Sequence, residues 1–430
     1  MKSSLNRDLL RIALPAIVSN ITTPVLGLID VAIVGHFGSA AFIGAIAVGG
    51  TMFNMLYWLF GFLRMGTAGM TAQACGARDG EATSASLVRS LAVALVAGLA
   101  LVGLSAVLGP AALRFVDADP ATEVPALRYF SICIWGAPAV LGMYALNGWW
   151  LGMQDSRTPM WVSIGINLAN IAASLTLVFG LGLRIEGVAL GTLAAQWLGF
   201  MAGIVVTWRR FRPSRPPVAV IADGRALRRM FSINADIFLR TLCLVAVTVW
   251  FTRAGASQGV TVLAANALLM QLFMFFSYFS DGFAFAGEAL AGRCYGAGDS
   301  DGLRQVIGLL LRWAAGLAIV FAAAYFGVGE AAMGLLTDDG DVVDAAREYL
   351  PWAASVPLVG SVAFIYDGIF IGLTLTRAML GAMAVSTATY FAVYLALMPL
   401  LGNHGLWAAF IVYLGVRSAM MHYMAKRKQK

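Results

Sequence analysis

A carboxylate inside an apolar stretch is the first feature of this chain that could carry chemistry. Asp30 lies in the stretch PVLGLIDVAIVG, and no Lys or Arg of the first half of the chain lies at a comparable depth. About 18 residues separate it from the polar beginning of the stretch, which places it about 27 Å along a helix. A charge inside hydrocarbon is costly, so an unpartnered carboxylate there favours its neutral form. Asp30 is therefore predicted to bind and release a proton.

The residues that precede or approach Asp30 fit this prediction. Pro24 removes a backbone hydrogen bond six residues earlier, which makes the helix easier to bend. Uncharged polar side chains of two later apolar stretches are expected near the carboxylate, namely Asn170, Ser174, Thr192 and Gln196. Such side chains also serve as hydrogen-bonding glue between helices. A purely structural carboxylate, hydrogen-bonded to neighbouring hydroxyl groups, is the alternative interpretation of Asp30.

The second half of the chain carries a different set of charges inside its apolar stretches. Asp236 and Arg240 share one helix face at a spacing of four, and Asp281 and Glu288 share a face at a spacing of seven. Arg240 is expected to pair with Asp281 or Glu288, because an uncompensated guanidinium in hydrocarbon is costly. The pattern fits a structural ion-pair network and a second functional site equally well.

Membrane-spanning helices are the elements that must position these residues. The chain of 430 residues is 60% apolar and only 12% charged, and its mean hydropathy is +0.81. Such a composition is typical of a polytopic membrane protein, in which about 20 helical residues cross about 30 Å of hydrocarbon. Apolar runs bounded by charge, Gly or Pro predict twelve spans, at residues 12–35, 42–75, 86–109, 127–150, 160–182, 187–208, 232–254, 260–291, 303–329, 349–374, 379–401 and 405–424.

The distribution of basic residues predicts how these spans are oriented. If the N-terminus is cytoplasmic, most Lys and Arg residues fall in cytoplasmic segments, including residues 209–229 and the tail AKRKQK. The opposite side then holds few basic residues, namely Arg114, Arg128, Arg184, Arg253 and Arg347. The positive-inside rule therefore places the N-terminus in the cytoplasm, and an even number of spans returns the C-terminus to the same side.

The two halves of the chain repeat the same landmarks in the same order. At an offset near 220, GARD at residues 76–79 matches GAGD at residues 296–299, and NGWWLGMQDSR at residues 147–157 matches DGIFIGLTLTR at residues 367–377. An internal duplication explains this order. The predicted fold is therefore all-α, with twelve transmembrane helices in two pseudo-symmetric six-helix bundles.

Two bundles with an even number of spans insert in the same orientation. Parallel repeats of this kind enclose a site between two lobes in alternating-access transporters. We expect an N-terminal lobe at residues 1–208, a basic and Pro-rich cytoplasmic linker at residues 209–231, and a C-terminal lobe at residues 232–430. The linker is interpreted as a solvated topology anchor, with contact to anionic lipid as a minor addition.

Other kinds of chemistry find little support in the residues. Cys75, Cys133, Cys243 and Cys294 lack the paired spacing of a metal site, and the three His residues are scattered at span ends. The acids are dispersed as well, so we expect no metal site and no intramembrane enzyme. The net charge of +7 is spread over loops, and we therefore expect no nucleic-acid partner.

Five segments together resemble the multidrug and toxic compound extrusion (MATE) transporters, specifically their DinF-like branch. The resemblance covers essentially the whole chain and rests on LIDVAIVGHFG in the first span, FGFLRMGTAGMTAQACGARDG at 60–80, NGWWLGMQDSRTPM at 147–160, ADIFLRTL at 235–242 and SYFSDGFAFAGEALAGRCYGAGD at 277–299. It implies a V-shaped pair of six-helix bundles. It also implies export of organic, often cationic compounds in exchange for protons or sodium.

The resemblance also implies roles for single residues. By position, Asp30 resembles the first-span carboxylate whose protonation is proposed to bend that helix in DinF-like members. Asn170 and Thr192 resemble members of the polar network around that carboxylate. Where the family often has an Asp one turn after the Asn, this chain has Ser174. This departure makes a purely sodium-coordinating N-terminal site less convincing, because sodium prefers several charged or carbonyl oxygens.

The residues and the resemblance together predict a proton-coupled antiporter that uses no cofactor and exports small organic, cationic or amphipathic compounds. We expect it to act as a monomer in the lipid bilayer of a bacterial inner (plasma) membrane. A sodium-coupled multidrug antiporter and a flippase for lipid-linked precursors are the alternatives within transport. A purely structural scaffold is disfavoured by the unpartnered Asp30.

Overall fold

Helices form almost the whole chain. The computed structural model describes residues 2–35, 40–116, 120–337 and 339–428, and these residues contain no strand. Each predicted span coincides with a helix or with a nearly continuous helical run. Within the described residues, ten helices are long and apolar enough to cross a membrane. The prediction of an all-α polytopic membrane fold is confirmed.

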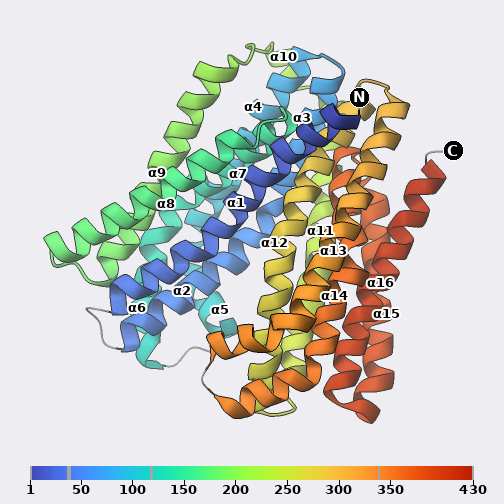
Figure 1. Ribbon diagram of the computed structural model, residues 1–430. Coiled ribbons are helices and arrows are strands. Elements are labelled where there is room, and N and C mark those ends of the chain that lie inside the picture. Colours follow the sequence, from blue (N-terminus) through green and yellow to red (C-terminus); the bar gives the residue numbers. More distant parts are fainter. Residues whose placement is uncertain (1, 36–39, 117–119, 338, 429–430) are drawn as a thin grey trace. The chain divides into compact units, whose positions relative to one another are not determined.

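The chain divides into two compact units, which we call the N-terminal unit (residues 14–231) and the C-terminal unit (residues 1–13 and 232–430). The described elements of the N-terminal unit are most of α1 (Lys2–Gly35), α2 (Ala40–Trp58), η1 (Leu59–Gly61), α3 (Phe62–Gly76), α4 (Gly80–Gly103), α5 (Ser105–Val116), α6 (Pro120–Cys133), η2 (Ile134–Gly136), α7 (Ala137–Gly152), α8 (Arg157–Leu175), η3 (Thr176–Gly180), α9 (Ile185–Val206), η4 (Thr207–Phe211), α10 (Val218–Ile221) and the first turns of α11 (Gly224–Ala256). The helix α7 packs against α3, α4 and α9 and is buried along nearly its whole length, so it forms the centre of this unit (Figure 1).

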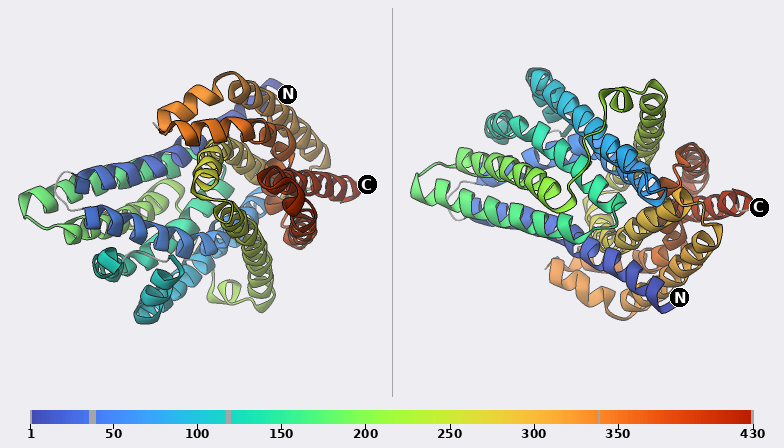
Figure 2. Two further views of the ribbon diagram at one scale, coloured as in Figure 1. Left: turned by 90° about the horizontal axis from the view of Figure 1, so that it is seen from below. Right: turned by 90° about the horizontal axis from the view of Figure 1, so that it is seen from above.

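The C-terminal unit is built around α14 in the same way. Its described elements are the first turns of α1, the rest of α11, α12 (Val260–Gly296), α13 (Ser300–Leu336), α14 (Gly340–Gly372), α15 (Thr376–Leu401) and α16 (Asn403–Lys428). The helix α14 packs against α12, α13 and α16. The helices α15 and α16 lie side by side and pack against each other (Figures 1 and 2).

The duplication predicted from the sequence is visible in the backbone. Arg78 and Gly298, at positions paired by the offset of 220, both have positive φ angles, of 57° and 70°. Gln154 and Thr374 are paired by the same offset and have φ angles of 67° and 52°. The two halves therefore use the same turns at the same places in the repeat.

The same offset relates a close helix crossing in each unit. A Cβ atom on Gly148 of α7 would collide with the backbone oxygen of Arg64 on α3. A Cβ atom on Gly368 of α14 would collide with the backbone oxygen of Ala284 on α12. Small residues allow helix backbones to approach this closely in membranes. Glycine at these two positions thus sets the packing distance in both units.

Aromatic side chains fill much of the core. Phe53 of α2 stacks on Tyr57 and Phe130, with ring centroids 5.4 and 5.0 Å apart. In the C-terminal unit, Phe276 of α12 packs edge-on against Phe321 of α13 at 5.5 Å. Phe275, the residue before it, is exposed, as expected for a side chain that faces lipid. The aromatic stretches are therefore divided between the core and the surface of their units.

The basic segment between the two halves is held against the N-terminal unit. Ser214 donates a hydrogen bond to Ser84 at 2.9 Å, and Arg210 forms an ion pair with Asp155 at 3.0 Å. Arg89 of α4 donates to the carbonyl oxygen of Ile221 at 2.9 Å. The segment is largely exposed, yet these contacts hold it against α4 and against the turn that follows α7.

Candidate functional site

The predicted polar network of the N-terminal unit joins α8 and α9. Asn170 donates a hydrogen bond to Thr192 at 3.0 Å and accepts one from Ser174 at 3.3 Å. Asn170 and Ser174 are buried, and Thr192 is half-buried. Gly191 lets α9 approach α8 at this level, because a Cβ atom there would press on Ser174. The structure therefore brings together three of the four uncharged residues that the sequence analysis selected.

The fourth residue, Gln196, lines a separate cavity of about 160 Å³ between α7, α8 and α9. The cavity is lined by Val140, Met143, Tyr144, Asn147, Pro159, Ser163, Ile166 and Gln196. Two side-chain oxygens of its wall, Oδ1 of Asn147 and Oε1 of Gln196, are buried and have no hydrogen-bond partner. Buried polar atoms without a partner are uncommon and costly in proteins. Oε1 of Gln196 lies against Gly136, which does not line the cavity, so this oxygen is enclosed by the protein.

A second cavity of the N-terminal unit lies beside the basic segment. It has a volume of about 390 Å³ and is lined by Cys75, Arg78, Asp79, Gly80, Thr83, Ser84, Trp149, Met153, Phe211, Arg212, Pro213 and Ser214. The carboxylate of Asp79 caps the N-terminus of α4, where it accepts a hydrogen bond from the backbone N–H of Ala82 at 2.8 Å. Arg78 and Arg212 are exposed at its rim.

The predicted coupling residue lies on α1. The helix continues from Lys2 to Gly35 without interruption, through Pro24. Pro24 is exposed. The side chain of Asp30 lies outside the described residues, so its role and its neighbours stay predictions. The helix-bending role of Pro24 also stays a prediction.

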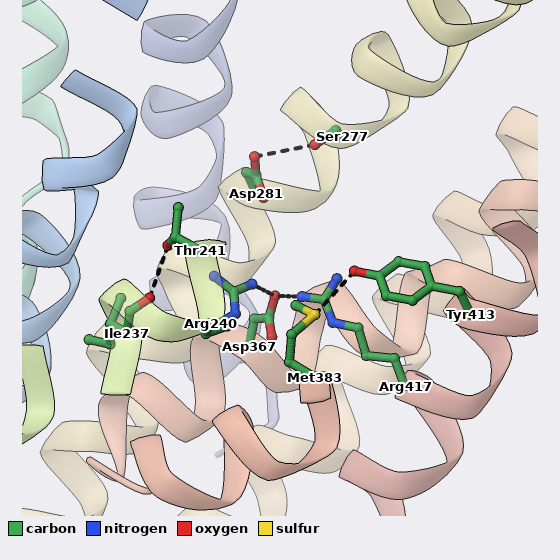
Figure 3. A network of polar contacts seen from close by, with 9 residues as sticks. All are labelled: Ile237, Arg240, Thr241, Ser277, Asp281, Asp367, Met383, Tyr413 and Arg417. Carbon is green, nitrogen blue, oxygen red and sulfur yellow. Dashed lines mark hydrogen bonds and ion pairs between the residues drawn. The ribbon is translucent and has the colours of Figure 1, made fainter. Parts of the chain in front are cut away.

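The charged network of the C-terminal unit has a different composition from the one expected. Arg240 pairs with Asp367 of α14, a residue that the sequence analysis did not select (Figure 3). Arg417 of α16 pairs with the same Oδ2 atom of Asp367. The three side chains, which we call the Arg–Asp–Arg triad, join α11, α14 and α16. The partner of Arg240 is therefore Asp367 of α14, and not Asp281 or Glu288 of α12 as expected.

The acids that the sequence analysis selected have their own places near the triad. Asp236 accepts a hydrogen bond from Thr376 of α15 at 2.8 Å. Asp281 of α12 accepts a hydrogen bond from Ser277 at 3.4 Å (Figure 3). Glu288, two turns further along α12, is buried. Of the four predicted members of the charged network, only Arg240 belongs to the triad.

The triad is deeply buried for a group of three charges. Arg240, Asp367 and Arg417 are 6%, 8% and 3% exposed. Breaking a buried ion pair by removing one partner costs about 3–5 kcal/mol, because the remaining charge is left without compensation. Asp367 and Arg417 each lie inside a predicted span, so the intramembrane-charge rule that selected Asp30 also identifies them from the sequence.

Comparison with known proteins relates this architecture to one family over most of the chain. The family model described as MatE matches residues 15–200 and 235–396. The DNA damage-inducible protein F of Escherichia coli (strain K12) is 37% identical over 427 residues, which cover 99% of this chain and 93% of that protein. The multidrug resistance protein MdtK of Edwardsiella ictaluri (strain 93-146) is 25% identical and covers 96% and 94% of the two chains.

Solved structures agree with the fold. The crystal structure of the Vibrio cholerae MATE transporter VcmN in the bent form superposes with a TM-score of 0.90, covering 100% of this chain and 97% of that chain. The sequence identity is 16%, so this likeness concerns the fold alone.

Proposed function

The chain belongs to the MatE family of membrane transporters, and from that membership we propose that it is an antiporter that exports organic compounds in exchange for protons. Multidrug resistance proteins are among its relatives. The compounds are cationic or amphipathic, and the exporter acts as a monomer in a bacterial inner membrane. Both of its termini lie in the cytoplasm.

The cavity between α7, α8 and α9 is the observation that carries this proposal. Its wall combines the apolar side chains of Val140, Met143 and Ile166 with the polar side chains of Asn147 and Gln196. Ligand sites for small molecules typically have this composition, with a few polar groups in an apolar wall. A volume of about 160 Å³ accommodates one part of a drug-sized molecule rather than the whole.

Proton coupling is assigned to Asp30 on the first span. Protonation from the outside removes its charge, favours a bent first helix and expels the compound. Deprotonation toward the cytoplasm then resets the cycle. Such a switch works only when the two conformations differ in proton affinity, because a proton that binds both equally shifts no equilibrium.

The coupling is tested in inverted membrane vesicles loaded with the protein and energised by respiration. Collapse of the proton gradient is expected to stop transport of a cationic dye, whereas collapse of the sodium gradient leaves the rate unchanged. Vesicles without the protein provide the background. Transport that depends on sodium alone would replace the proton assignment, and transport that needs neither gradient would overturn the antiporter proposal.

Replacement of Gln196 by Leu tests the cavity. Ethidium, which carries N–H donors, is expected to be exported about five- to tenfold more slowly, because the variant loses the amide group of a residue that lines the cavity. Tetraphenylphosphonium has no donor and is expected to keep its rate. Leu198→Ala, on the exposed face of the same helix, is the matched control. Equal losses for both dyes would assign Gln196 to folding rather than to binding.

A further inference from the structure

The cavity beside the basic segment carries two cations at its rim. Arg78 follows α3, Arg212 belongs to the basic segment, and both side chains line this cavity of about 390 Å³. Neither guanidinium group forms a hydrogen bond or an ion pair with the residues that the structure describes. Asp79 supplies the one negative charge of the wall and caps α4. The wall therefore carries more positive than negative charge.

The other polar side chains of the wall are bonded within the protein. Thr83 donates to the backbone oxygen of Asp79 at 2.7 Å, and Ser214 donates to Ser84 at 2.9 Å. The indole N–H of Trp149 donates to the backbone oxygen of Thr83 at 2.9 Å. The two guanidinium groups are thus the strong donors that this cavity offers to a ligand. Such a ligand is an anion.

The backbone conformation of the turns does not account for the two arginines. Arg78 and Arg212 have φ angles of 57° and 46°, in the left-handed region that is unfavourable for a residue with a Cβ atom. At the matching turn of the second half, the residue equivalent to Arg78 is Gly298. Glycine adopts this conformation without the steric cost. The turn alone would favour glycine, so Arg78 is explained by its side chain.

The cavity lies where membrane helices begin and end. The helices α3 and α7 end at Gly76 and Gly152, α4 begins at Gly80, and all three belong to candidate membrane spans. Trp149 and Phe211 add apolar surface to the wall and pack edge-on at 5.3 Å. Lipid headgroups lie at the ends of membrane helices, and basic pockets between such helices bind the headgroups of anionic lipids.

We propose that this cavity binds the phosphate group of an anionic phospholipid, such as phosphatidylglycerol, through Arg78 and Arg212. A guanidinium group binds phosphate through two parallel hydrogen bonds. The volume of about 390 Å³ accommodates a headgroup, while the acyl chains stay in the bilayer. The bound lipid holds the basic segment against α3, α4 and α7. The inference goes beyond the proposed export function and does not depend on the exported compound.

The thiol of Cys75 reports whether the cavity is occupied, because this half-buried side chain lines it. The full-length protein in detergent is treated with N-ethylmaleimide, and mass spectrometry of its peptides follows the labelling of each cysteine. Phosphatidylglycerol at about ten times its dissociation constant is expected to slow the labelling of Cys75 about tenfold. Phosphatidylcholine, whose choline group repels the guanidinium groups, is expected to give little protection. Cys294, half-buried outside the cavity, is the internal control.

Glycine variants separate binding from folding. Arg78→Gly and Arg212→Gly each remove a charged donor and relieve an unfavourable backbone conformation. Each is expected to weaken phosphatidylglycerol binding about tenfold, yet to be at least as stable as the wild type without lipid. Arginines with a purely structural role predict lower stability instead. Arg228→Gln, an exposed position of α11 outside the cavity, is the matched control for lost charge and is expected to keep full protection.

Inorganic phosphate distinguishes the two sources of a phosphate group. A lipid site predicts that inorganic phosphate protects Cys75 far less than phosphatidylglycerol does. Arginine-dependent protection by inorganic phosphate, with none by the lipid, would assign the cavity to a soluble ligand and overturn the inference. Equal protection by the two lipids would also overturn it, as would full protection in both glycine variants. Dye export in vesicles is measured separately, so this proposal and the proposed function can each fail alone.

Discussion

Asn in place of Asp30 is expected to reduce proton-driven export to the rate of vesicles that lack the protein. Asparagine has nearly the same size as aspartate but does not take up a proton, so the variant keeps the packing and loses the titrating group. The measurement is dye export in energised vesicles across a range of pH values. Asp30→Glu, which retains a carboxylate, is expected to preserve part of the activity and its dependence on the proton gradient.

Asp301→Asn is the matched control for this prediction. Asp301 lies near the start of α13, and its side chain is 81% exposed, so the same chemical change occurs there in water. Its export rate is expected to equal that of the wild type. Undiminished proton-driven export by Asp30→Asn would remove the coupling role from this residue. Dye binding that persists in the variant while export stops would place the defect in coupling rather than in folding.

Gly368→Ala is expected to destabilise the protein by up to about 2 kcal/mol. The added methyl group would overlap the backbone oxygen of Ala284, so α12 and α14 must move apart at this position. Overpacking of a buried site typically costs about 1–3 kcal/mol. The usual gain of about 1 kcal/mol for Gly→Ala inside a helix opposes this cost only in part. Unfolding of the purified protein in detergent measures the effect.

Gly381→Ala provides the control with the opposite sign. Gly381 also lies inside a helix, α15, but a Cβ atom there would meet nothing within 4 Å. Only the helix propensity changes, so this variant is expected to be as stable as the wild type or slightly more stable. Equal stability of the two variants would show that the α12–α14 crossing relaxes freely.

The helices and their repeat could be predicted because they depend on local rules. A chain in hydrocarbon must satisfy its backbone hydrogen bonds internally, so long apolar runs become helices. The repeat could be predicted because matching turns such as GARD and GAGD occur at the same offset in both halves. The equivalent residues Arg78 and Gly298 share a positive φ angle in the structure. Residues with an intrinsic signal, such as a charge inside a span, could be selected from the sequence as well.

The partner of Arg240 could not be predicted in this way. Asp236 lies one helical turn away on the same face, yet it accepts from Thr376, whereas Arg240 reaches Asp367. The pairing depends on the rotation and height of α11, α14 and α16 relative to one another. Helix packing sets these quantities, and Gly368, which brings α14 against α12, contributes to them through residues remote from the charges.

The amino-acid sequence by itself determined which segments are helical, that they occur twice, and which side chains are too polar for their surroundings. Only the tertiary structure decided how these side chains are grouped. In the structure, Asn170 donates a hydrogen bond to Thr192, and Gln196 lines the same cavity as Asn147. Asp367 forms ion pairs with two guanidinium groups, those of Arg240 and Arg417. The physical reason is that helix formation in hydrocarbon is satisfied within one segment, whereas a polar contact requires a particular register between segments.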